Sequence, residues 1–184
     1  MLTIVALFAG LVLAALWGLA AGSTSAALSL ANAYKVPMVI LLSAVTALPA
    51  GLVTLRLMGS PLRAHQIVSA FATSIFGGTL VLATLAPLVA IYYHTSSKAG
   101  LPIALGSVFV AIGVASLLFS RAVARRVGET TSRRVSSLSG VVVLVVLFVA
   151  ALLQFVAMAS PIIGNKSTRF DGGFDTVFSR GHGA

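Results

Sequence analysis

The chain has 184 residues, of which 59% are hydrophobic and 8% charged, with a mean hydropathy of +1.10. A soluble domain carries about 25% charged residues and could not cover so apolar an interior with polar surface, so a bilayer is indicated as the solvent. In a membrane protein, the net charge of +9 bears on the orientation of the chain and on its attraction to anionic lipid. We therefore expect no nucleic-acid partner. The absence of cysteine excludes disulfides and thiolate metal sites.

Residues 2–21 form an uncharged apolar segment. Because no basic n-region precedes it, the segment reads as a first membrane span and not as a signal peptide. We expect Trp17 near one interface. Gly18 and Gly22 form a G-x-x-x-G pair, which permits close helix approach but also occurs in ordinary small-residue helix ends.

Residues 22–34 are rich in Ser, Ala and Asn, and three readings stay open: a loop, an interfacial helix or a continuation of the first span. The second span is predicted after Lys35, over residues 36–57. Pro37 would then occupy its first turn, where a missing N–H costs nothing, and Pro49 would kink it.

The third and fourth spans are predicted over residues 67–93 and 101–119. At 1.5 Å per residue the third is roughly 40 Å long, which exceeds the ~30 Å hydrocarbon core, so it must tilt or kink at Pro87. Small residues recur every four positions on both spans and predict helix-packing faces. These residues are Ala70, Ser74 and Gly78 on the third span, and Ser107, Ala111 and Ala115 on the fourth.

Residues 120–135 hold five of the twelve basic residues and separate the fourth span from a fifth over residues 139–160. We expect this segment to be a loop that lies along an anionic membrane surface. Its arginines are Arg121, Arg125, Arg126, Arg133 and Arg134. The positive-inside rule then favours a cytoplasmic N-terminus and a C-terminus on the opposite side.

The fold class that follows is an all-α polytopic transmembrane helical bundle of about five spans, or four if the first segment is re-entrant. We expect a transmembrane domain over residues 1–164 and a polar tail over residues 165–184. Three phenylalanines in the tail recur at helical spacing and form either a partner-docking stripe or aromatics that dip into the interface. They are Phe170, Phe174 and Phe178.

The residues that could carry chemistry are few. All three acids lie in the basic segment or the tail, which disfavours coupling to protons or sodium ions. Gln154 is either a pore group or an interhelical hydrogen-bonding group. His65 and His94 lie roughly 40 Å apart along the third span and cannot share a metal ion. With no catalytic motif present, we expect no enzyme activity, no metal and no cofactor.

Several short motifs resemble a group of uncharacterised bacterial multi-span proteins that is loosely similar to Yip1-type membrane proteins. The motifs lie between residues 15 and 165. They are Lys35-Val36-Pro37, Leu48-Pro49, Gly59, Leu85-Ala86-Pro87 and Pro161-Ile162-Ile163-Gly164. The resemblance implies a small polytopic helical protein and brings no catalytic residue with it.

Two functions are consistent with these features. The leading hypothesis is a non-enzymatic integral membrane protein of the bacterial inner membrane. It would be a structural or accessory subunit of a homo- or hetero-oligomeric complex and would pack against its own copies or other membrane proteins. The alternative is a passive channel or permease for a small solute. Pro49, Pro87 and Gln154 facing one water-filled cavity would favour the channel, and dry helix contacts would favour the subunit.

Overall fold

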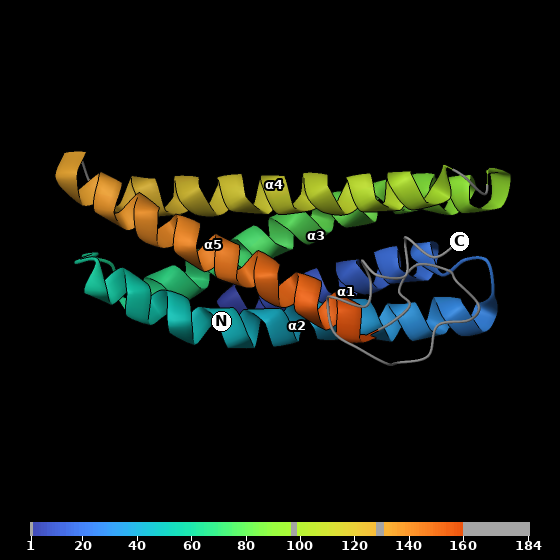
Figure 1. Ribbon diagram of the computed structural model, residues 1–184, viewed down its shortest axis with the longest axis horizontal. Coiled ribbons are helices and arrows are strands. Elements are labelled where there is room, and N and C mark those ends of the chain that lie inside the picture. Colours follow the sequence, from blue (N-terminus) through green and yellow to red (C-terminus); the bar gives the residue numbers. More distant parts are fainter. Residues whose placement is uncertain (1, 97–98, 128–130, 160–184) are drawn as a thin grey trace, which may run out of the picture.

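The computed structural model describes residues 2–96, 99–127 and 131–159, and these form five helices arranged along one long axis (Figure 1). The helices are α1 (Leu2–Ala21), α2 (Ala26–Leu57), α3 (Ala64–Thr95), α4 (Gly100–Val127) and α5 (Thr131–Ala159). Each of these five is long and apolar enough to cross a membrane. The predicted all-α transmembrane bundle is confirmed, and its first segment is one continuous helix of 20 residues.

The second helix begins well before its predicted start. Ser25 caps α2, because its hydroxyl accepts a hydrogen bond from the Leu28 N–H at 3.2 Å. The stretch after the cap is therefore helical and continuous with the span. Pro37 consequently lies inside α2, and the prediction that it occupies a first turn was wrong.

The arginine-rich segment is also more helical than predicted. The last turns of α4 carry Arg121, Arg125 and Arg126, and the first turns of α5 carry Arg133 and Arg134. The predicted loop over 120–135 was therefore wrong, since helix continues to Val127 and resumes at Thr131. Arginine and alanine are good helix formers, and cations near the C-terminus of α4 interact favourably with its dipole.

The helices pack unevenly. Extensive contacts join α3 to α1 and α4, and join α2 to α1 and α5, whereas α4 and α5 make fewer contacts with each other. Figure 1 shows α5 starting beside the end of α4 and crossing the bundle diagonally toward α2. The two last helices therefore converge at the arginine-rich end and diverge away from it.

Reciprocal small-residue contacts fix α5 on α2. A Cβ built at Gly51 would lie 2.5 Å from the Leu144 side chain, and one built at Gly140 would lie 2.5 Å from the Leu55 side chain. Both leucines are fully buried. Each helix thus inserts a leucine where the other has only hydrogen, an arrangement that suits packing in lipid, where hydrophobic burial does not hold helices together.

Candidate functional site

The space left by the divergence of α4 and α5 is an apolar groove of about 240 Å³. All five helices contribute to its walls. Its residues include Trp17 of α1, Val36, Val39 and Ile40 of α2, Ile75 and Leu82 of α3, Ile112 and Ala115 of α4, and Val149 and Leu152 of α5. An apolar cavity of about 150 Å³ holds benzene, so this groove has room for a hydrocarbon segment. An α-helix, about 10–12 Å across with its side chains, is too wide to lie inside it.

Three aromatic rings close the groove toward the arginine-rich end. The ring of Phe71 on α3 makes edge-to-face contacts with Phe119 on α4 and Phe148 on α5, with ring centroids 5.6 and 5.2 Å apart. All three rings line the groove. Edge-to-face geometry adds attraction beyond the area that the rings bury. The layer joins the three helices where α4 and α5 converge.

The opposite end of the groove is open to the outside of the bundle. Phe109 on α4 and Leu153 and Val156 on α5 line it, and all three are exposed. In a membrane, exposed apolar side chains on membrane-spanning helices face lipid tails. The groove is therefore accessible from the hydrocarbon of the bilayer.

The hydroxyls of Ser74 and Thr79 in the groove walls are satisfied within the protein. The Ser74 hydroxyl donates to the Phe71 carbonyl at 2.7 Å, and the Thr79 hydroxyl lies 3.0 Å from the carbonyls of Ile75 and Phe76. Serine and threonine in helices commonly bond to carbonyls of the preceding turn in this way. These hydroxyls are thus directed at their own helix, and the groove presents a hydrocarbon surface.

Trp17 is buried inside the bundle, where it contacts α4. It is 3% exposed, lines the groove, and donates its indole N–H to the Ser107 hydroxyl at 3.0 Å. That hydroxyl in turn donates to the Ala104 carbonyl at 2.7 Å. A hydrogen-bond partner on α4 allows the whole ring to be buried in the bundle, and its depth near one membrane interface stays a prediction.

The predicted pair Gly18 and Gly22 lies where α1 meets α2. A Cβ at Gly18 would lie 2.4 Å from the Asn32 carbonyl oxygen, and one at Gly22 would lie 2.5 Å from the Ser29 Cα. The two backbones therefore approach more closely than any side chain would allow. The pair joins consecutive helices of one chain.

The two predicted small-residue faces also meet within the chain. A Cβ at Gly78 would lie 3.0 Å from both the Ala111 carbonyl oxygen and the Ala115 Cβ. Ala70 and Ser74 are buried on the same face of α3. Gly78 thus packs on Ala111 and Ala115, and Ser107 binds Trp17 of α1, so these residues are not available as contacts between copies.

The residues proposed for a channel do not come together. Pro49, Pro87 and Gln154 occupy exposed positions on α2, α3 and α5 respectively. None of them lines the groove. They therefore do not share a cavity, which would have favoured the channel. They also do not lie in buried helix contacts, which would have favoured the subunit.

The basic and titratable residues lie away from the groove walls. Arg121, Arg125 and Arg126 are exposed, and the Arg126 guanidinium donates to the Gln66 carbonyl at the start of α3. The side chains of Arg133 and Arg134, and the tail with its three phenylalanines, lie outside the described residues. His65 and His94 are exposed toward opposite ends of α3. Among the described residues, no group of histidine and acidic side chains could hold a metal ion.

No protein-family model, curated protein or solved structure matches this chain. The resemblance to Yip1-type proteins therefore stays a prediction. The fold and the apolar helices define the class: an all-helical integral membrane protein with a groove open to lipid.

Proposed function

We propose that this protein is a non-enzymatic accessory membrane protein that binds the hydrocarbon chain of a lipid in the groove between α4 and α5. The proposal rests on the hydrogen bonds that polar groups of the wall make within the protein. These groups are the hydroxyls of Ser74 and Thr79 and the indole N–H of Trp17. Apart from the Ser116 hydroxyl, the remaining lining is apolar, and such a wall favours an apolar occupant. Close contact with such walls restores the dispersion attraction that an empty groove would lose.

The apolar character of the groove walls argues against a pathway for water or a polar solute. A water molecule in a protein interior needs two to four polar partners, and the groove walls supply few. The residues that would have supported a channel lie on the outside of three different helices. Binding of a chain is therefore the better-supported function, and the channel alternative has no support in the groove.

The experiment uses a reporter that the chain already contains. Trp17 is its only tryptophan, and it is buried against the groove. Bromine atoms on an acyl chain quench indole fluorescence at contact. The purified protein is titrated in detergent with phosphatidylcholine that carries brominated chains, and we expect saturable quenching of Trp17.

Two matched variants on α5 provide the control. Val149→Phe adds a ring inside the groove and should abolish the quenching, whereas Val146→Phe adds the same ring at a position that is 59% exposed outside it and should not. Equal quenching in the parent and both variants would mean that the chains reach Trp17 by another route, and the proposal would fail.

An accessory role in a larger complex, in the bacterial inner membrane, is proposed alongside lipid binding. It is motivated by the broad apolar exterior, which includes Phe8 of α1 and Phe109 of α4. Because the small-residue faces are engaged inside the chain, a partner would have to bind on other exposed surfaces. A native mass measurement after mild extraction would count copies and partners, and a bare monomer would contradict this role.

A further inference from the structure

A tight turn joins α2 to α3 at the arginine-rich end of the bundle. Gly59 adopts φ +74°, a conformation that favours glycine, and its N–H donates to the Arg56 carbonyl at 3.0 Å. The N–H of Ser60 donates to the Leu55 carbonyl, also at 3.0 Å. These two bonds form a Schellman motif, which ends α2 and turns the chain back. As a result Ala64, the first residue of α3, lies beside the last turns of α2.

The turn leaves a shallow hollow on the outside of α2. Its walls are Leu52, Val53, Arg56 and Leu57 of α2 and Ala64 of α3. Few contacts join α2 and α3 directly, so α3 does not fill this space. Val53 and Leu57 are 58% and 83% exposed, and Arg56 is exposed beside them. The hollow therefore combines one cation with apolar side chains that face the surroundings of the bundle.

The guanidinium of Arg56 has no acidic neighbour in the described part of the chain. All three acidic residues of the sequence lie outside that part: Glu129, Asp171 and Asp175. Among the described residues, no hydrogen bond or ion pair engages this guanidinium, whereas that of Arg126 donates to the Gln66 carbonyl. A guanidinium is always charged in a protein and offers five N–H donors. Arg56 is therefore available to bind an anion from outside the chain.

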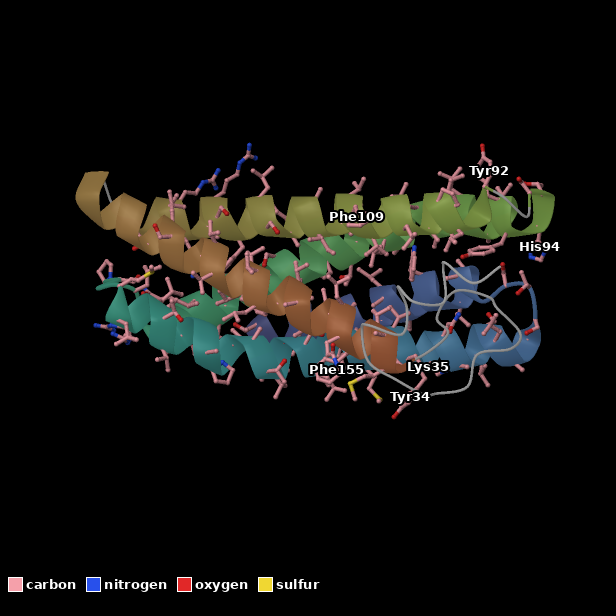
Figure 2. The ribbon with its side chains drawn as sticks, viewed as in Figure 1. Tyr34, Lys35, Tyr92, His94, Phe109 and Phe155 are labelled. Carbon is pink, nitrogen blue, oxygen red and sulfur yellow. The ribbon has the colours of Figure 1, made fainter. Side chains whose placement is uncertain are left out.

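The hollow lies at the level expected of lipid headgroups. Arg56 is in the last turn of α2, and Leu52 and Val53 lie one turn, about 5 Å, deeper in the span. Figure 1 shows the end of α2 at the same end of the bundle as the end of α4. Side chains tipped with nitrogen project outward there in Figure 2, whereas the labelled Tyr92 and His94 lie at the opposite end. Moving inward along α2, a cation is followed by apolar side chains, which is the order of phosphate and acyl chain in a phospholipid.

We propose that this hollow binds an anionic phospholipid, to whose phosphate Arg56 donates hydrogen bonds while the first methylenes of one chain lie on Val53 and Leu57. Charge complementarity selects this occupant, because further exposed arginines make the same end of the bundle positive. They are Arg63, Arg121 and Arg125. The site is separate from the groove between α4 and α5 and does not rest on chain binding there. Because the hollow is shallow, its lipid exchanges with the bilayer, so we expect selective contact and not a lipid that survives extraction.

A tryptophan introduced at the rim reports which lipid occupies the hollow. Leu57 is 83% exposed, so Leu57→Trp adds an indole without displacing packed atoms, and Trp17→Phe removes the native signal. The double variant is reconstituted in vesicles of equal amounts of phosphatidylglycerol and phosphatidylcholine, and only one of the two lipids carries bromine near the headgroup end of its chains. One basic residue near anionic lipid changes binding about fivefold. We expect phosphatidylglycerol to compete for the hollow about fivefold better than phosphatidylcholine.

Two arginine variants in this background assign the preference to a residue. Arg56→Gln should lose the fivefold preference, whereas Arg121→Gln should keep it, because Arg121 is exposed at the same end but does not line the hollow. Quenching by the two lipids together should stay at the parental level, which shows that the reporter still lies in lipid. Equal quenching by the two lipids before any arginine is changed would overturn the site. So would an unchanged preference in Arg56→Gln, or an equal loss in Arg121→Gln. Since Trp17 is absent, the outcome is independent of chain binding in the groove.

Discussion

Replacing Gly18 by alanine tests the close approach of α1 to the backbone of α2. The added methyl would lie 2.4 Å from the Asn32 carbonyl oxygen, 2.8 Å from its carbon and 3.1 Å from the Ala33 Cα. All three are backbone atoms, so no side-chain rotation can relieve the contact. Helix α1 must move away from α2, and Trp17, the neighbour of Gly18, must move with it.

Two opposed effects set the change in the free energy of unfolding that Gly18→Ala causes. Inserting a methyl into a well-packed contact costs about 1–3 kcal/mol. Replacing glycine by alanine within a helix favours the helix by about 1 kcal/mol. Gly113→Ala isolates the second effect, because no atom lies within 4 Å of a Cβ at that position on α4. The difference between the two variants is therefore about 1–3 kcal/mol against Gly18→Ala.

Thermal unfolding in one detergent, followed by circular dichroism, measures that difference. For a chain of this size about 1 kcal/mol corresponds to roughly 2–4 °C in Tm. We expect Gly18→Ala to melt several degrees below Gly113→Ala and to show altered Trp17 fluorescence. A Gly18→Ala variant that melts with or above Gly113→Ala would refute the close approach of α1 and α2.

Three further predictions concern packing, topology and charge. Gly78→Leu should lower Tm more than Gly113→Leu, because its side chain meets Ala111 and Ala115 on α4; equal melting would show that α3 does not pack through this face. Reporter fusions should read in, out, in and out after residues 60, 97, 130 and 184, and a cytoplasmic C-terminal signal would overturn the orientation. Replacing four arginines by glutamine should weaken retention of anionic lipid or the fidelity of insertion, whereas no change in either would show that they are merely solvated. These are Arg125, Arg126, Arg133 and Arg134.

The number and type of the helices could be predicted because long apolar runs have few alternatives in a membrane. Their ends could not, since the helices continue beyond the apolar runs. Ser25 caps α2 within a stretch too polar to be counted as a span, and alanine and arginine carry α4 as far as Val127. Hydropathy identifies the part of a helix that crosses the hydrocarbon core, whereas caps and helix propensity decide where the helix ends.

The groove could not be predicted, because it depends on the angle at which α5 leaves α4. That angle is set by contacts such as Gly51 with Leu144, which join residues far apart in the sequence. The sequence did mark the small residues on α3 and α4, but it could not identify what packs against them. For the same reason it could not show that Ser107 binds Trp17 and draws that ring into the interior.

Native mass measurement of the protein with its co-purified lipids tests directly whether a lipid chain occupies the groove. We expect the parent chain and Val146→Phe each to retain one phospholipid under mild activation, and Val149→Phe, with the groove filled, to retain none. A parent chain that carries no lipid, or a Val149→Phe variant that retains as much as the parent, would contradict it.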